Sequence, residues 1–261
     1  MAYCATAAFA ALSGLDQLQL AREGVDTGLL RAAAESPNFH VRSFTLGNPN
    51  LPLDVVTAVV ANGVPQALTA VLKRPNLPED LVIRAVSLLV ALPREEAFLT
   101  LRSTRALGLR AVMSRRDQTE SVLLLGARSV IPMVAQAAAS APGATPQVMS
   151  AALKHGDVAT RIQVALTASP EVLAGHNWAK ERSMKVLLAS APRATGVALG
   201  VISRRLTRSA NPEYRTMAAR FSSTTEEVSA LCVDVEAQVR ATAAANPVAT
   251  EDDKVLEALL R

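Results

Sequence analysis

The chain has 261 residues, of which 50% are hydrophobic, 3% are aromatic and 19% are charged, with a formal net charge of +4. One globular core is near its usual upper size at this length, and aromatic side chains are scarce, so the composition favours thin layers of helices built from Ala, Val and Leu. The two cysteines, Cys4 and Cys232, are too far apart in the sequence for a disulfide framework or a metal-ligand spacing. We expect no cofactor and no metal.

The N-terminal residues 1–14 are apolar but lack the basic segment that begins a signal peptide, so none is expected here. The most apolar later window, residues 121–141, contains Arg128 and Pro132. No uninterrupted run reaches the roughly 18 apolar residues that a membrane span needs. A cytoplasmic protein without a membrane segment is therefore expected.

A short sequence motif near the start of the chain recurs near its end. Val41-Arg42 is followed by Asn48-Pro49, and Val239-Arg240 is followed by Asn246-Pro247, with six positions from Arg to Asn in both. Pro49 and Pro52 recur as Pro75 and Pro78 at a shift of 26, and residues 214–219 recur as 239–244 at a shift of 25. A weaker copy occupies residues 157–170. Self-similarity at about 25 residues indicates a repeat architecture of roughly eight to ten units.

Each unit predicts two short helices. A small-residue helix, such as residues 31–36 or 240–245, is expected to stop where a proline follows, at Ser36-Pro37 and at Asn246-Pro247, since proline has no N–H and restricts the residue before it. A turn comes next, then acidic residues such as Glu79-Asp80 that suit a helix N-terminus, and then an apolar run at helical spacing, as in residues 81–89. Stacked neighbours can bury faces that one unit leaves exposed.

This Val-Arg…Asn-Pro…Thr/Pro pattern resembles the leucine-rich-repeat-variant family and, more broadly, short HEAT-like helical repeats. The resemblance is good over residues 37–60 and 214–261, fair over 63–90 and 157–173, and poor over 94–140. It implies an all-α fold, a right-handed α-solenoid of two-helix repeats forming one continuous domain over residues 1–261. We expect irregular middle repeats at 94–140 and an acidic C-terminal capping repeat at 221–261. One described family member holds an iron–sulphur cluster on N-terminal cysteines, and this chain lacks them.

Charge is distributed unevenly along the chain. Residues 102–220 carry 17 basic and 6 acidic side chains, whereas residues 221–261 carry 3 and 8. In a solenoid, equivalent positions of successive units line up, so the basic residues predict either a binding stripe for an acidic protein or nucleic acid or a solvated face. The residues assigned to this basic surface are Arg102, Arg105, Arg115, Arg116, Arg182, Lys185, Arg204, Arg205 and Arg208.

A second group of arginines recurs at equivalent repeat positions. Recurrence predicts a structural role, with each guanidinium bonding to carbonyls or carboxylates of a neighbouring unit. This group consists of Arg42, Arg84, Arg161, Arg215 and Arg240.

Catalytic signals are few. The three histidines, His40, His155 and His176, show no metal-binding spacing, and the sequence contains no nucleophile elbow, P-loop or dinucleotide fingerprint. Some HEAT-like solenoids are alkylpurine DNA glycosylases, which grip duplex DNA with a basic face and several aromatics. Trp178 is the one plausible stacking residue in the basic region here, and a local plug between repeats is the alternative for it.

Three functions follow as expectations. The first is a non-enzymatic scaffold that binds an acidic protein partner on a concave, Arg-rich central surface. The second is sequence-independent duplex binding by the same surface, with glycosylase-like activity as its enzymatic form. The third is a structural subunit, a homo-oligomer in which the basic middle of one copy meets the acidic C-terminal end of another.

Overall fold

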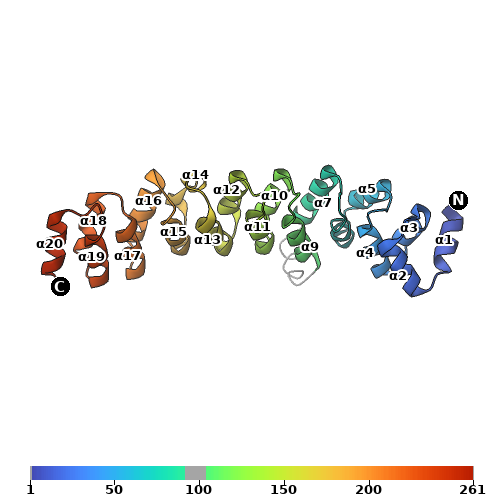
Figure 1. The fold of residues 1–261 in the computed structure, drawn as a ribbon, viewed down its shortest axis with the longest axis horizontal. Helices are drawn as coiled ribbons and strands as arrows, with labels where there is room; N and C mark the ends of the chain where they lie inside the picture. Colours follow the sequence, from blue (N-terminus) through green and yellow to red (C-terminus); the bar gives the residue numbers. More distant parts are fainter. Residues whose placement is uncertain (1, 92–103, 261) are drawn as a thin grey trace. The chain divides into compact units, whose positions relative to one another are not determined.

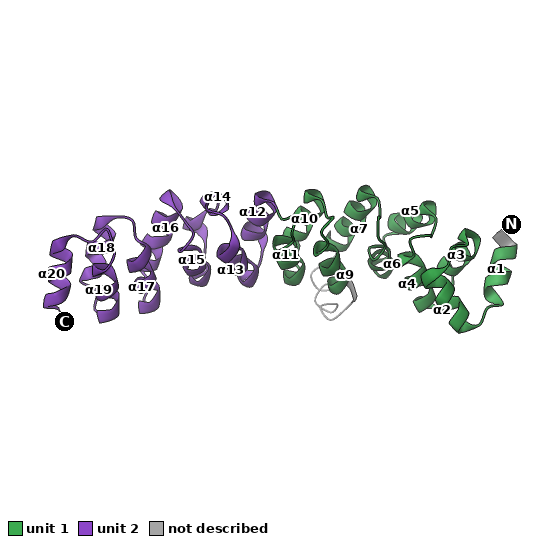
Figure 2. Ribbon diagram, in the orientation of Figure 1, with its two compact units in different colours: residues 1–144 green, residues 145–261 purple. Residues whose placement is uncertain are grey.

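The computed structural model describes residues 2–91 and 104–260 and is all-helical, with no strand in these segments. The chain divides into two compact units, residues 1–144 and 145–261 (Figure 2). The continuity of the repeat stack over residues 1–261 therefore stays a prediction.

Unit 1 contains short helices separated by tight turns (Figure 1). Within its described residues they are α1 (Ala2–Ala10), α2 (Gly14–Glu23), α3 (Thr27–Ala34), α4 (Phe39–Gly47), α5 (Leu53–Asn62), α6 (Pro65–Val71), α7 (Glu79–Ala91), α9 (Thr104–Met113), α10 (Glu120–Ala127) and α11 (Pro132–Ala139). The last three helices fall in the region expected to be irregular, and residues 94–103 of that region lie outside the described part.

Unit 2 is also built of short helices. Its elements are α12 (Pro146–His155), α13 (Val158–Thr167), α14 (Pro170–Ala174), the 3₁₀ turn η1 (Trp178–Lys180), α15 (Met184–Ser190), α16 (Gly196–Thr207), α17 (Pro212–Phe221), α18 (Thr225–Cys232), α19 (Ala237–Ala244) and α20 (Glu251–Leu259).

Helices within each unit pack against the helix two places along the chain, which produces two rows. In unit 1 one row consists of α2, α4, α6, α9 and α11. In unit 2 one row consists of α13, α15, α17 and α19. The second row of unit 2 runs α12, α14, α16, α18 and α20. The core between the rows is made of fully buried aliphatic side chains such as Leu68, Leu187 and Ile202, with many alanines around them. Small side chains let the thin layers approach closely, and their burial supplies the main stabilisation.

The Asn of the repeated motif ties successive turns together. Asn48, the C-cap of α4, donates from Nδ2 to the carbonyls of Ala21 (3.2 Å) and Gly24 (3.1 Å). Asn246, after α19, donates to the carbonyls of Ala219 (2.7 Å) and Ser222 (3.1 Å). In both cases the partner turn lies 24–27 residues earlier. The side-chain amide therefore satisfies carbonyls that the end of the preceding helix leaves without an intrahelical donor.

At other turns, arginine side chains donate hydrogen bonds to backbone carbonyls of an earlier turn in the same way. Arg74 reaches the carbonyls of Leu51 (2.6 Å) and Pro49 (2.8 Å), and Arg115 reaches that of Leu72 (2.8 Å). Arg193 reaches the carbonyl of Ala168 at 3.4 Å. Each guanidinium spans one turn-to-turn step, so Asn and Arg are alternative donors for one structural task.

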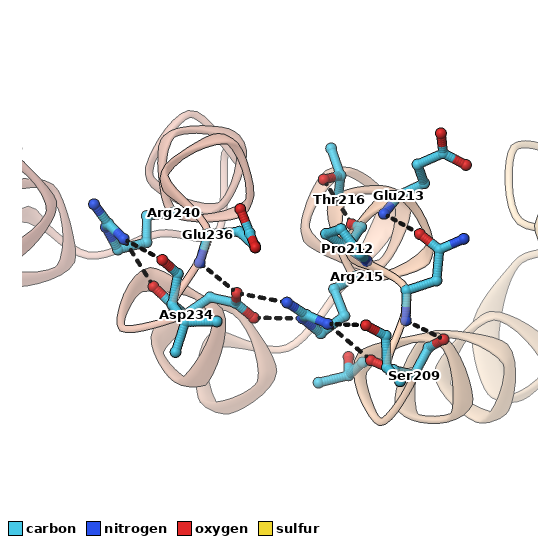
Figure 3. A network of polar contacts seen from close by, with 12 residues as sticks. Ser209, Pro212, Glu213, Arg215, Thr216, Asp234, Glu236 and Arg240 are labelled. Carbon is cyan, nitrogen blue, oxygen red and sulfur yellow. Dashed lines mark hydrogen bonds and ion pairs between the residues drawn. The ribbon is translucent and has the colours of Figure 1, made fainter.

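The recurring arginine forms a second, separate motif. Arg42, Arg215 and Arg240 each donate from Nη1 to the carbonyls six and five positions earlier, in the turn before their own helix, at 2.5–3.2 Å. Figure 3 shows how Arg215 also holds the Asp234 carboxylate, with Nε–Oδ2 at 2.7 Å and Nη2–Oδ1 at 3.0 Å. The Nη2 of Arg240 donates to the carbonyl of Leu260 (2.9 Å). Each of these two arginines thus joins the turn before its own helix to a residue 19 or 20 positions ahead.

The two remaining arginines of this predicted group behave differently. Arg161 faces the Glu181 carboxylate, 20 positions ahead, at 3.4 Å between Nη2 and Oε1. Arg84 is exposed on α7, and within residues 2–91 and 104–260 it makes no hydrogen bond or ion pair.

The Arg215–Asp234 pair predicts an acid-sensitive contribution to stability. The Arg215 hydrogen bonds lower the pKa of Asp234 below its ordinary value. A carboxylate with a depressed folded pKa contributes stability that is complete above its unfolded pKa of about 3.9 and is lost as the pH falls through the folded value. We expect Asp234→Asn to lower the urea midpoint at pH 7, and the gap to wild type to shrink at about pH 3. The exposed Asp252→Asn is the matched control, and a gap that does not change with pH would contradict the assignment.

The last helix of the acidic C-terminal repeat exposes apolar side chains and buries acidic ones. Val255 and Leu259 are 58% and 78% exposed on α20, while the acidic Asp253 and Glu257 are buried. Asp253 turns inward because its carboxylate accepts hydrogen bonds from Ser229 and from the Thr250 backbone, closing a capping box.

Candidate functional site

The residues of the predicted basic surface differ in their surroundings. Arg115 and Arg205 are only partly exposed and donate to backbone carbonyls, Arg205 to those of Trp178 (2.8 Å) and Glu181. Arg116, Lys185 and Arg208 are exposed, and Arg204 lies 3.8 Å from Glu227. Arg102 lies outside the described residues, and Arg105 is the second residue of α9.

Arg182 belongs to a groove of unit 2 that gathers several charged side chains. The groove has a volume of about 700 Å³ and lies where α12, α13, α14 and the segment through η1 meet. Its lining residues are Ser150, Leu153, Lys154, Arg161, Val172, Gly175, His176, Asn177, Lys180, Glu181 and Arg182. The structure therefore brings Arg161, expected to be structural, to the same hollow as Arg182, expected to bind.

Local sequence explains how the segment that closes the groove is held. Helix α14 is only five residues long and ends at Gly175, after which the chain turns through Asn177 into η1. Trp178 is 2% exposed, and its Nε1–H donates to the carbonyl of Leu173 at 2.7 Å. Arg205 then binds the carbonyls of Trp178 and Glu181 from the neighbouring helix. Trp178 is thus a buried plug in this segment, and Arg205 fixes the backbone that carries Lys180 and Arg182.

Glu181 is the one acidic residue that lines the groove, and its carboxylate lies close to Arg161 and His176. It is buried, and its Oε1 accepts the Ser183 backbone N–H at 2.8 Å and lies 3.4 Å from Arg161 Nη2. Its Oε2 lies 3.6 Å from His176 Nε2. Such a buried carboxylate needs these partners, because an unpaired buried charge is strongly unfavourable.

His176 lies between this carboxylate and the Trp178 ring. The two rings meet edge to face with centroids 4.5 Å apart. Burial lowers the pKa of His176, the Glu181 carboxylate acts in the opposite direction, and Arg161 adds to the lowering. The imidazole is therefore mainly neutral at pH 7, so the positive charge of the groove comes from its lysines and arginines.

The lining of this groove contains four cationic side chains and one carboxylate. Lys154, Lys180 and Arg182 are exposed, and within the described segments none of them makes a hydrogen bond or ion pair. The Nε of Arg161 and the Nε2 of His176 are buried and lack a hydrogen-bond partner among the described residues. The groove is thus an electropositive hollow in which the Arg161 Nε–H is left unsatisfied, which suits an anion.

The residue types of a hydrolytic triad also line the groove. Catalysis by Ser150, His176 and Glu181 would need a hydrogen bond between the serine and the histidine. No hydrogen bond joins Ser150 to His176 in the described residues. The distance between His176 Nε2 and Glu181 Oε2, 3.6 Å, is also too long for a hydrogen bond. The geometry supports anion binding better than nucleophilic catalysis.

The sequence prediction missed Lys154 and Lys180 because each is an isolated lysine in a different helical element. One signal was present, since Arg128, Lys154 and Lys180 follow one another at intervals of 26 residues, close to the repeat period. Glu181 and His176 carried no such signal. Their proximity to Arg161 depends on the turn after α14, whose shape the repeat pattern does not specify.

Other candidate sites are weaker. A smaller groove of about 320 Å³ between α4 and α6 is lined by Phe39, Leu46 and Val64 among others, and it is mainly apolar. In the described segments no cluster of His, Cys, Asp or Glu is arranged to hold a metal ion. His40 and His155 are exposed and lie outside both grooves. Among the helices described, none combines the length and apolarity required to pass through a lipid bilayer.

Comparison with known proteins leaves the groove as the main guide to function. No protein-family model, curated protein or solved structure matches this chain.

Proposed function

We propose that the protein is a non-enzymatic helical-repeat scaffold of the cytoplasm that binds an acidic protein partner through the basic surface of unit 2, with the groove as its anchor point. The observation that carries this proposal is the charge of the groove, whose lining has four cationic side chains and one carboxylate, which faces Arg161. An acidic side chain entering the hollow would replace water around cations that have no partner within the described segments.

The proposed architecture is a right-handed α-solenoid of HEAT-like repeats whose concave face carries the basic surface. Two features support it. Helices within each unit pack against their next-but-one neighbours, and the Asn and Arg side chains join turns that are 23–27 residues apart in most cases. Stacked repeats present long surfaces suited to extended partners.

The test compares an acidic ligand with a nucleic acid on the same protein. A labelled Asp/Glu-rich 20-residue peptide and a labelled random DNA duplex are titrated at low and at physiological salt and followed by fluorescence anisotropy. We expect the peptide to bind, and Lys180→Glu/Arg182→Glu to weaken it by about tenfold or more, which corresponds to at least about 1.4 kcal/mol.

The matched control is Arg208→Glu/Arg220→Glu, which makes the same change in charge at exposed positions of unit 2 outside the groove. Equal weakening by both double variants would contradict the groove as the anchor. Tight duplex binding that falls by orders of magnitude with salt, without peptide binding, would replace the proposal with the nucleic-acid alternative.

A further inference from the structure

The basic groove has room and charge for more than a carboxylate. Its volume is about 700 Å³, whereas a carboxylate fills only a small part of such a space. After Glu181 balances one cation, three positive charges remain among Lys154, Arg161, Lys180 and Arg182. A single carboxylate would neutralise one of them, and a group with two negative charges fits the balance better.

The donors of the groove have the forms that recognise phosphate. An arginine guanidinium presents a planar fork of N–H groups, and lysine supplies a compact charge that binds phosphate as a point contact. Arg161 contributes a buried Nε–H that no acceptor in the described segments satisfies. A buried donor without an acceptor is unfavourable, so a ligand oxygen there gains more than it would at an exposed site.

The groove is also preorganised. Arg161 is held by Glu181 from one side, and the backbone of residues 178–181 is held by Arg205. Lys154 comes from α12 and Lys180 from η1, so cations approach the hollow from separate elements. A preorganised site loses less conformational freedom on binding.

We infer that this groove is a recognition site for a phosphate monoester, the dianionic group of a phosphorylated serine or threonine on the partner. The inference rests on the proposed function, which it deepens by naming the group that enters the groove. A phosphoserine carries about −1.5 to −2 charges at pH 7 and three strong acceptor oxygens, enough for Arg161 and the two lysines together.

The experiment measures binding of small capped amino acids by isothermal titration calorimetry. The probes are N-acetyl-phosphoserine amide, N-acetyl-serine amide, N-acetyl-glutamate amide and inorganic phosphate, each titrated into the full chain at pH 7.5. We expect the phosphoserine compound to bind at least about tenfold more tightly than the glutamate compound, and the serine compound not to bind measurably.

Variants assign the site. Lys154→Ala/Lys180→Ala changes two exposed side chains and is expected to weaken phosphoserine binding by about tenfold. Arg110→Ala/Arg220→Ala changes two exposed arginines outside the groove and is expected to leave binding unchanged. Arg161→Lys keeps the charge but removes the Nε–H and the planar fork, and it is expected to weaken binding while the circular dichroism spectrum stays native. Trp178, the only tryptophan of the chain, touches His176 and gives a fluorescence signal for binding in the groove.

Three results would overturn the inference: equal affinity for phosphoserine and glutamate, binding that survives Lys154→Ala/Lys180→Ala, or loss of binding in the Arg110/Arg220 control. If phosphate alone binds as tightly as the phosphoserine compound, the source is a free phosphate and not a partner side chain. Because the acidic 20-residue peptide contains no phosphate, its binding tests the scaffold function separately. That function stands if the peptide binds at the groove and phosphoserine has no advantage.

Discussion

Replacing Asn246 by Ala is expected to destabilise the protein by about 2–3 kcal/mol, because one buried amide serves several carbonyls of the preceding turn. Its Nδ2 donates to the carbonyls of Ala219 and Ser222, and its Oδ1 accepts the Val248 backbone N–H. Alanine removes these bonds and leaves the carbonyls buried without their donor. Urea unfolding followed by circular dichroism at 222 nm measures the loss.

The matched control for this change is Asn62→Ala, an exposed asparagine at the end of α5. A surface change of this kind is expected to alter stability by no more than about 0.5 kcal/mol. A loss of similar size in both variants would show that the side-chain amide of Asn246 is not the cause. Asn48→Ala should behave like Asn246→Ala, since its amide reaches the carbonyls of Ala21 and Gly24.

Replacing Trp178 by Ala is expected to cost about 3–5 kcal/mol. The ring is 2% exposed, contacts His176 and donates its N–H to the Leu173 carbonyl. Truncation leaves a cavity and removes the indole hydrogen bond to the Leu173 carbonyl, which keeps the His176 backbone N–H as a donor, so the cavity is the main source of the destabilisation. Because the variant has no tryptophan, circular dichroism in urea is the suitable measurement.

Val197→Ala is the control for the tryptophan change, since Val197 is 85% exposed on α16. We expect it to change the free energy of unfolding by less than about 0.5 kcal/mol. A Trp178→Ala variant as stable as wild type would contradict the plug assignment. We also expect the tryptophan variant to lose phosphoserine binding, because the segment that carries Lys180 and Arg182 depends on the buried ring.

The all-α fold was predictable because the spacing of similar residues gives the repeat period and because specific residue types mark the helix ends. The Asn-Pro pairs at residues 48 and 246 do follow helices, and the acidic pair Glu79-Asp80 does begin α7. Helix ends were less predictable. The helix expected at residues 31–36 is α3, Thr27–Ala34, which begins four residues earlier because Asp26 caps it by accepting the Leu29 N–H.

The groove was much less predictable than the fold. A residue that recurs at the repeat spacing can be recognised in the sequence. Arg42, Arg215 and Arg240 recur in this way, and all three make the same contact with the turn before their helix. The groove instead depends on one short helix, α14, and on the non-repeating turn after it. Arg205 was assigned to a binding surface on charge alone, and only the path of that turn reveals that its guanidinium is occupied by backbone carbonyls.

The donors that cross from turn to turn also define the step by which this protein can change in length. Asn48 and Arg74 each donate to backbone carbonyls of an earlier turn. Deleting part of the repeat that carries such a donor leaves those carbonyls without it. Deleting a whole period places the donor of the next repeat at the same position. Lengthening or shortening should therefore succeed in multiples of about 25 residues. This makes the repeat, with its single Asn or Arg, the natural module for building longer or shorter versions around the unit 2 groove.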